Sequence, residues 1–383
     1  MDRYLGLMHS RSARPTRFGD VAARDPIADL REIAFRLERA NEATYRVRAF
    51  RSAAAAIGKL SAAELAQRAA DGSLRNLPGV GEVTARCVAE SLAGEEPVYL
   101  RRLAATADTD LDSETEALRR ALRGDCHSHS DWSDGGSPIP EMAMAAAGLG
   151  HEYLVVTDHS PRLTVARGLS PERLRQQLDE IADLNAQLPK EFRILTGIEV
   201  DILADGALDQ EPELLARLDV VVGSVHSNLR DDRDVMTKRM LAAVANPHLD
   251  ILGHCTGRKV STKDGGSTTP TGDRAHRRSP IRKESEFDAE AVFAACVRYD
   301  KAVEINCRPD RLDPPKRLLR LAMEAGCRFS IDTDAHAPGQ LDWLPYGCER
   351  AARCGVPAER VVNTWPAALL LKWTATHGTG EVT

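Results

Sequence analysis

Two histidines separated by one residue are the first side chains in this 383-residue chain whose types and spacing could do chemistry. His127 and His129 alternate along what reads as the end of a short strand, so both imidazoles would point to one face. Converging imidazoles are ligands for a borderline metal such as Zn²⁺, Mn²⁺ or Fe, and Asp134-Gly135 turns the chain over the same place. On its own the pair fits two surface histidines equally well, so the remaining sequence must decide.

Further metal-ligating side chains follow, each near the end of an apolar, strand-like run. From Arg123 onward such runs alternate with helical stretches, a pattern typical of a β/α barrel. Because the C-terminal ends of parallel barrel strands meet at one face, six histidines and three carboxylates are predicted to converge there. The nine candidate metal ligands are His127, His129, Asp134, His159, Glu199, His226, His254, Asp334 and His336.

The N-terminal part of the chain reads as helical. Asp25-Pro26 supplies an N-cap and a proline at the first helical position, and apolar residues then recur at helical spacing. Further on, Leu77-Pro78 leads through Gly79, Val80 and Gly81 into another helix. The backbone amides of this turn would hold a nucleic-acid phosphate, as in a helix-hairpin-helix motif. The alternative is an ordinary tight turn between packed helices.

The composition argues against several classes of protein. A formal charge of −6 is not that of a strongly basic nucleic-acid binder, so any such binding must come from local patches. The eight cysteines lack Cys-x-x-Cys spacing, which indicates reduced, buried thiols and predicts a cytoplasmic location. The sequence shows neither a signal peptide nor a run of about 18 apolar residues, so we expect no membrane association.

From Arg123 to Leu371 the chain resembles the PHP (polymerase and histidinol phosphatase) family of metal-dependent phosphoesterases, because its polar strand ends match the metal-ligand motifs of that family. The resemblance implies an α/β fold, a distorted (β/α)7-type TIM-like barrel, that holds three divalent metal ions, which would be Zn, Mn or Fe. It implies that the first metal takes His127, His129, Glu199 and Asp334, the second shares Glu199 and takes His226 and His254, and the third takes Asp134, His159 and His336.

Asp25 to about Leu103 resembles the small all-α N-terminal domain of family X DNA polymerases, in which the run Tyr45–Arg51 is also familiar. The polymerase beta version has a Schiff-base lysine shortly after the hairpin, and Cys87 stands at that position here. Because a cysteine cannot form the imine, we expect no lyase activity. The chain then continues into Asp125 where a polymerase would place its nucleotidyl-transfer domain, so we expect no polymerase activity. An aspartate at position 134, where some PHP members have histidine, fits the polymerase-X-linked branch.

The resemblance to PHP enzymes also implies a mechanism. A water between two cations loses its proton near neutral pH and attacks phosphorus, while the metals neutralise charge on the phosphate oxygens. Glu199 and Asp334 would be catalytic by holding these metals. Arg258 is the candidate for gripping a non-bridging oxygen, since its planar fork matches phosphate, and the alternative is a salt bridge at the barrel rim. Asp158 would orient His159 or a neighbour. Further candidates for the substrate surface are Arg308 and Arg311.

The predicted domain organisation follows from these changes in pattern. Within the barrel, residues 259–284 read as an insertion that is first rich in Gly, Ser and Thr and then basic, and its composition predicts disorder. It would be either a basic flap over a nucleic-acid strand or a solvated loop. The predicted parts are a basic tail at 1–21, a helical domain at 22–104, an acidic linker at 105–122, the barrel at 123–373 and a tail at 374–383.

Three activities stay open on the sequence alone. The first is hydrolysis of DNA, as a 3′–5′ exonuclease or a 3′-end-processing enzyme of DNA repair, which the hairpin region supports. The second is a phosphomonoesterase for a small metabolite such as histidinol phosphate or a nucleotide, which the acidic net charge allows. The third is an amidohydrolase, for which a third metal would be surplus. A non-enzymatic scaffold is a further alternative, but it would not need a complete set of metal ligands. The expected partner is therefore DNA or a small phosphate ester, and the sequence does not indicate an oligomeric state.

Overall fold

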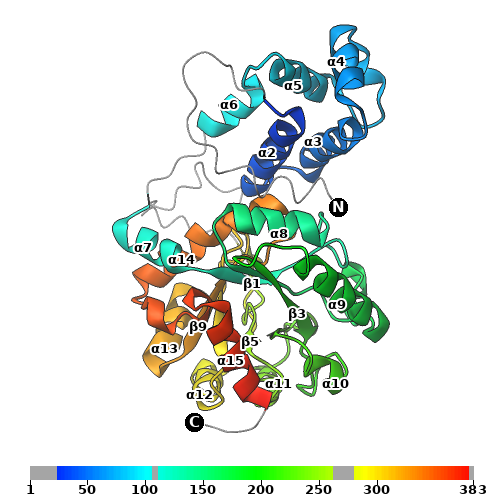
Figure 1. The fold of residues 1–383 in the computed structure, drawn as a ribbon. Helices are drawn as coiled ribbons and strands as arrows, with labels where there is room; N and C mark the ends of the chain where they lie inside the picture. The colour runs from blue at the N-terminus through cyan, green and yellow to red at the C-terminus, as the bar shows by residue number, and fades with distance from the viewer. Residues whose placement is uncertain (1–23, 106–110, 262–279, 379–383) are drawn as a thin grey trace. The chain divides into compact units, whose positions relative to one another are not determined.

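The chain forms two compact units, Met1–Thr109 and Asp110–Thr383, each with a hydrophobic core of its own. The computed structural model describes residues 24–105, 111–261 and 280–378 (Figure 1). The predicted basic tail at 1–21 lies outside the described residues.

The first unit is a set of short helices around an aliphatic core (Figure 1). Helix α2 begins after Asp25, whose carboxylate accepts a hydrogen bond from the N–H of Ile27 at 2.9 Å. Its residues Leu30, Ile33 and Leu37 recur at helical spacing, are fully buried and face α3 and α5. The helices of this unit are α2 (Pro26–Arg39), α3 (Thr44–Ile57), α4 (Ala62–Ala70), η2 (Ser73–Asn76), α5 (Glu82–Leu92) and α6 (Val98–Ala105).

The second unit is built on seven parallel strands in the order β1-β2-β3-β4-β5-β8-β9. A parallel bridge between Ser128 and Ala335 brings the two outer strands together, so the sheet nearly closes into a barrel. Strands β2, β4 and β8 are buried along their whole length, as expected where helices cover a parallel sheet. The strands are β1 (Gly124–Ser128), β2 (Tyr153–Val156), β3 (Arg193–Asp201), β4 (Val220–Ser224), β5 (Ile251–Leu252), β8 (Ala302–Asn306) and β9 (Arg328–Asp332).

Helices connect successive strands and surround the sheet (Figure 1). Each crossover returns the chain in the same direction, so all the C-terminal strand ends lie at one edge of the barrel. This arrangement confirms the predicted TIM-like barrel preceded by a small all-α domain. The helices are α8 (Ile139–Gly148), α9 (Pro171–Asn185), α10 (Pro212–Leu215), α11 (Arg233–Val244), α12 (Ala289–Arg298), α13 (Lys316–Ala325), α14 (Leu344–Arg353) and α15 (Ala367–Gly378), with short turns η3 (Thr164–Ala166), η4 (Pro338–Trp343), η5 (Ala358–Arg360) and η6 (Val362–Thr364).

The stretch that the sequence suggests as an acidic linker, residues 105–122, is partly a helix of the second unit. Asp112 caps helix α7 (Ser113–Ala121) by accepting from the N–H of Thr115 at 2.8 Å. The helix packs against α14, and Leu118 and Leu122 belong to the barrel core. The acidic residues lie mainly in the first turn, where they favour a helix N-terminus, which is why a charged segment is structured here.

The predicted tail at 374–383 also begins later than expected. Helix α15 continues to Gly378 because two of its side chains are held at the N-terminal end of the barrel. The Nε1 of Trp373 donates to the backbone oxygen of Asp300 at 3.1 Å, and Nδ1 of His377 lies 2.6 Å from Oδ1 of Asp250. These contacts extend the folded unit beyond residue 373.

The predicted insertion at 259–284 begins and ends in ordered strands. Strand β6 (Lys259–Val260) pairs antiparallel with β7 (Pro280–Arg282). The intervening residues 262–279 lie outside the described part of the chain, so the prediction of disorder for them is untested.

The burial of the cysteines agrees with the buried thiols that the composition predicted. All eight cysteines are buried and free. Within the ranges that the structure describes, no helix combines the length and the apolar character needed to cross a bilayer.

Candidate metal centre

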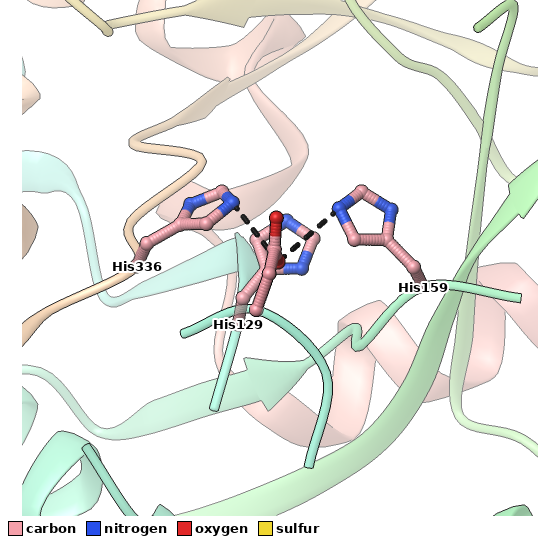
Figure 2. Close-up of side chains that lie close together, drawn as sticks. His129, His159 and His336 are labelled. Carbon is pink, nitrogen blue, oxygen red and sulfur yellow. Dashed lines mark ion pairs between the residues drawn. The ribbon is translucent and has the colours of Figure 1, made fainter. Parts of the chain in front are cut away.

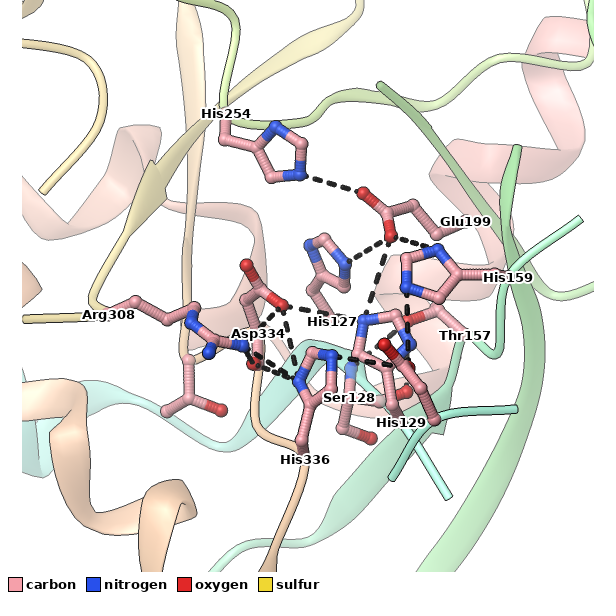
Figure 3. A network of polar contacts seen from close by, with 12 residues as sticks. His127, Ser128, His129, Thr157, His159, Glu199, His254, Arg308, Asp334 and His336 are labelled. Carbon is pink, nitrogen blue, oxygen red and sulfur yellow. Dashed lines mark hydrogen bonds and ion pairs between the residues drawn. The ribbon is translucent and has the colours of Figure 1, made fainter. Parts of the chain in front are cut away.

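The nine predicted ligands all lie at the C-terminal ends of the barrel strands. Figure 3 shows several of them, among them His127, Glu199 and His254, in one network of polar contacts. His127 lies within β1 and Glu199 within β3, and the others come from the loops that follow β1, β2, β4, β5 and β9. Asp334 has a φ of 53°, a conformation that is uncommon for a residue other than glycine and that often marks a functional site. Tertiary structure therefore brings together residues that are up to 209 positions apart, from His127 to His336.

Glu199 lies at the centre of this cluster and is only 1% exposed. Its Oε1 lies 2.8 Å from Nε2 of His254 and 3.3 Å from Nε2 of His226. Its Oε2 lies 2.8 Å from Nδ1 of His159 and 3.4 Å from Nε2 of His127. Burial disfavours the charge, but the imidazoles around it hold the pKa of Glu199 well below its ordinary value. The carboxylate is thus kept ionised and faces ligands on both of its oxygens.

A second group lies nearer to solvent, around Asp134 (Figure 2). Oδ1 of Asp134 lies 3.3 Å from Nε2 of His336 and 3.5 Å from Nε2 of His159. The ring of His129 stacks on that of His159, and its Nε2 lies 3.5 Å from Oδ1 of Asp334. Burial opposes the charge of Asp134, but the hydrogen bond and charge of His336 lower its pKa well below the ordinary value. We call Asp134, His159 and His336 the outer group.

The donor set fits divalent metal ions. Ligand atoms of the outer group and His129 lie within 4.8 Å of one another, as do those of His127, His129 and Glu199 and those of His159, Glu199 and His226. A buried polar atom without a partner is unfavourable, and a cation satisfies imidazole nitrogens and carboxylate oxygens through their lone pairs. Several buried atoms of the cluster make no hydrogen bond to any described residue. They are Nε2 of His127, Nδ1 of His159, Oε1 of Glu199 and both ring nitrogens of His129, His226 and His254.

Asp158 anchors the loop that carries Asp134. Its carboxylate accepts hydrogen bonds from the backbone N–H groups of Ser130 and Ser133, at 2.8 and 3.2 Å, and from both hydroxyls. Nε2 of Gln177 on α9 donates to it at 2.6 Å. Of the two roles that the sequence suggested, orienting His159 or a neighbour, the contacts support the neighbouring loop.

Glu304 is a contact of the cluster that does not belong to the nine predicted ligands. It is fully buried in β8, and its Oε1 lies 2.6 Å from Nδ1 of His127. Its Oε2 accepts from the backbone N–H of His254 at 2.5 Å and from Nδ2 of Asn306 at 3.2 Å. A charged residue between the apolar Val303 and Ile305 in the middle of a five-residue strand was the available signal.

The sequence favoured Arg258 as the phosphate-binding arginine, but the arginines that lie beside the cluster are Arg308 and Arg311. Arg258 donates to the backbone oxygens of Arg311 and Leu312, and its Nη1 lies 3.6 Å from Glu284, so it supports the loop after β8. Arg308 instead lies 3.3 Å from Oδ1 of Asp334. Nε of Arg311 lies 3.1 Å from Oδ2 of the same carboxylate. The interaction of Arg258 with the rim, which the sequence left as an alternative, is the one that its contacts support.

The hairpin has the expected shape, but some of its backbone amides already donate hydrogen bonds within the turn and the following helix. Gly79 has a φ of 87°, which favours glycine, and its backbone lies close to Ser52. The N–H of Val80 donates to the oxygen of Leu77 at 3.1 Å, and that of Gly81 donates to Oγ1 of Thr84 at 2.9 Å. A phosphate at this turn would therefore compete for the Gly81 amide or use that of Gly79 and the first turn of α5.

Cys87, which stands where a Schiff-base lysine was considered, is 3% exposed within the helical core. Burial raises the pKa of its thiol to about 11. The side chain is thus a packing residue, which agrees with the expectation that this unit has no lyase nucleophile at this position.

Comparisons with known proteins match both units. The family described as "PHP domain" matches residues 125–307, and the family described as "Helix-hairpin-helix domain" matches residues 22–96. The chain is 36% identical over 267 residues to "DNA polymerase/3'-5' exonuclease PolX" of Bacillus subtilis (strain 168), covering 70% of this chain and 43% of that protein. It therefore spans less than half the length of that relative.

Two shorter proteins each match somewhat more than three fifths of the chain. A protein named "Probable phosphatase" in Thermoanaerobacter sp. (strain X514) is 26% identical over 255 residues, covering 63% of this chain and 89% of its own length. The solved structure of histidinol phosphate phosphatase from Lactococcus lactis, complexed with zinc, L-histidinol and phosphate, is 20% identical, covers 62% of this chain and 95% of that chain, and gives a TM-score of 0.40. The barrel, the ligand cluster and the two family matches confirm both resemblances: the chain carries a helix-hairpin-helix domain followed by a PHP domain, the domain of metal-dependent phosphoesterases.

Proposed function

We propose that the protein hydrolyses phosphate ester bonds in DNA from the 3′ end, as an exonuclease or an end-processing enzyme of DNA repair. The observation that carries this proposal is the convergence of nine candidate ligands, among which four histidines lie against Glu199, in a chain that also has a helix-hairpin-helix domain. The similarity to the PolX protein of Bacillus subtilis, which extends over 70% of this chain, supports the choice of DNA.

The nine residues would hold three divalent cations, Zn²⁺, Mn²⁺ or Fe, in the three ligand sets that the family resemblance assigns. When bound, such cations would supply a nucleophilic water at neutral pH and neutralise charge on the phosphate. Glu199 would orient four of the histidines through its two oxygens. Glu199 and Asp334 would thereby be the carboxylates on which the chemistry depends.

Arg311 is placed to contact a phosphate oxygen. Its side chain is 11% exposed, and neither Nε nor Nη1 makes a hydrogen bond among the described residues. Its Nε lies 3.1 Å from Asp334, and its positive charge opposes the protonation of both His226 and His254, so it lies near these histidines as well. Because Nε already lies 3.1 Å from the carboxylate of Asp334, Nη1 is the donor that would bind a non-bridging oxygen and stabilise the charge that develops on it. The phosphate contact first sought at Arg258 is therefore proposed for Arg311.

A small phosphate monoester is the second candidate substrate. The relative named as a phosphatase matches over 89% of its own length, so nearly all of a protein with that name corresponds to 63% of this chain. With this substrate the hairpin domain would have no part in the reaction.

The deciding experiment supplies the Mn²⁺-loaded full chain with a 3′-labelled DNA oligonucleotide and, separately, with histidinol phosphate. The variants His129→Ala and Glu199→Ala serve as blanks, and His248→Ala, a histidine outside the cluster, serves as the matched control. Trimming of the oligonucleotide by the wild type and the control, but not by the blanks, supports the proposal.

Fast phosphate release from histidinol phosphate with intact DNA would instead establish the second candidate and overturn the first. Absence of hydrolysis with both substrates, in a protein that has bound metal, would contradict phosphoesterase activity on either class.

A further inference from the structure

Glu304 lies behind the metal centre at a point where ligands from three strands meet. The residue is fully buried, and its Oε1 lies 2.6 Å from Nδ1 of His127. Its Oε2 accepts from the backbone N–H of His254 and from Nδ2 of Asn306. The same Nδ2 donates to Oδ2 of Asp334 at 3.1 Å. One carboxylate thus connects residues of β1, β8 and the ends of β5 and β9.

The contact with His127 determines which of its nitrogens is available. A neutral imidazole carries its proton on one nitrogen and a lone pair on the other. Nε2 of His127 makes no hydrogen bond to any residue that the structure describes and lies 3.4 Å from Oε2 of Glu199, so this is the atom that faces the centre. When Nε2 binds a cation through its lone pair, Nδ1 must carry the proton, and Glu304 is the acceptor for it.

We propose that Glu304 is a positioning residue of the metal centre, which selects the tautomer of His127 that can bind metal and fixes the backbone of His254 beside it. Glu304 itself is not a ligand in this proposal, since its two oxygens are occupied by His127, His254 and Asn306. The inference rests on the metal centre proposed above. It goes beyond that proposal by naming a residue outside the nine ligands that controls metal affinity.

The effect of losing Glu304 on metal binding should be confined to the part of the centre that contains His127. Glu304 contacts His127 and the backbone of His254, and Asn306 links it to Asp334. In the outer group, Asp134 is held instead by the loop that Asp158 anchors, and the backbone N–H of His336 donates to Oε1 of Gln340. Losing Glu304 should therefore weaken the cation held by His127 while the outer group still binds.

The chain offers a matched control at the opposite end of the barrel. Asp250, which directly precedes β5, is also a buried carboxylate that lies 2.6 Å from Nδ1 of a histidine, His377. It accepts a backbone N–H as well, from Val221 at 2.8 Å. Glu304→Gln and Asp250→Asn therefore remove the same kind of charge from the same kind of pair, but only the first pair includes a proposed ligand.

The test measures metal binding rather than activity. Apoprotein of the wild type, Glu304→Gln, Glu304→Asp and Asp250→Asn is titrated with Mn²⁺ and with Zn²⁺ by calorimetry, and the metal content after gel filtration is determined by mass spectrometry. Glu304→Gln removes the carboxylate, and Glu304→Asp withdraws it from Nδ1 of His127. Both variants are expected to raise the Kd of at least one cation by about 10- to 100-fold, the usual effect of losing an interaction that orients a ligating histidine. Asp250→Asn should leave the metal Kd unchanged while lowering the Tm of the apoprotein.

Each other outcome would contradict either this inference or the metal centre on which it rests. If both Glu304 variants bind metal within about twofold of the wild type, a change far smaller than the expected one, the inference is wrong. It is equally wrong if Asp250→Asn weakens metal binding as much, because the effect would then be a general loss of stability. A wild-type protein that binds no metal would contradict the metal centre itself, which separates failure of the proposed function from failure of this inference.

Discussion

Nε2 of His254 lies 2.8 Å from Oε1 of Glu199, and the other oxygen of that carboxylate faces His127 and His159. This relationship makes Glu199 the residue on which most of the ligand geometry depends. Glu199→Gln keeps the size of the side chain but replaces one oxygen by a donor, which would face an imidazole nitrogen. We expect kcat/KM to fall by more than about 100-fold, since even residues that only orient ligands contribute 10- to 100-fold. Steady-state kinetics with the better substrate check this, and a loss below tenfold would contradict it.

The loop anchored by Asp158 leads to a prediction about the outer group. Asp158→Asn leaves one oxygen for the five donors of Ser130, Ser133 and Gln177, so the loop should shift and carry Asp134 with it. We expect the metal content to fall by one ion per chain and kcat/KM to fall by about tenfold. Gln177→Met, which removes only one donor, should show a smaller loss. Full metal content in Asp158→Asn would refute this role of the loop.

His151 predicts how stability depends on pH. It is buried, both ring nitrogens lack a hydrogen-bond partner in the described residues, and burial lowers its pKa to about 3. The unfolded chain, in which His151 has a pKa of about 6.5, binds a proton that the folded chain rejects, so stability falls as pH decreases from about 6.5 toward 3.

The variant His151→Leu should remove this part of the loss. At pH 5 it should gain about 2 kcal/mol of unfolding free energy from the absent titration alone, so its advantage over the wild type should be larger at pH 5 than at pH 8. Denaturant unfolding at both pH values measures this difference. An advantage that is the same at both would show that His151 is not the group responsible.

Metal removal should destabilise the second unit. The ligand nitrogens and oxygens lose their cation, and a bound ligand at 100 times its Kd contributes about 2.7 kcal/mol of stability. For a unit of this size we expect a chelator to lower Tm by about 5–10 °C. Scanning calorimetry with and without chelator, followed by re-addition of Mn²⁺, checks the change and its reversal. An unchanged Tm in protein shown to have lost its metal would contradict the expectation.

The hairpin gives a prediction that isolates DNA binding. Gly79 and Gly72 have φ values of 87° and 74°, and both lie in the first unit. Replacing either by alanine should destabilise this unit by about 1 kcal/mol. Only Gly79→Ala changes the proposed phosphate contact, so only this variant should weaken binding to a DNA oligonucleotide, measured by fluorescence anisotropy. Equal weakening by Gly72→Ala would assign the effect to stability instead.

The residue types at the strand ends were sufficient to predict the fold class and the nine candidate ligands. A β/α alternation requires a parallel sheet, and parallel strands end at one edge, so His127 and His336 could be placed together without knowing their distance. The hairpin at Gly79 was visible for a similar reason, because glycine at a fixed position reports the local backbone. Patterns of this kind depend on neighbouring residues and are present in the linear chain.

Contacts between distant side chains required the tertiary structure. Arg258 and Arg311 are both arginines after a strand end, and only the packing of the loop after β8 directs the first to the rim and the second to Asp334. Glu304 faces His127 because β1 and β8 meet across the barrel interior, 177 residues apart in sequence. Residue type defines what a side chain can bind, but the partner that it meets depends on where the backbone places both, and that is decided only when the barrel closes.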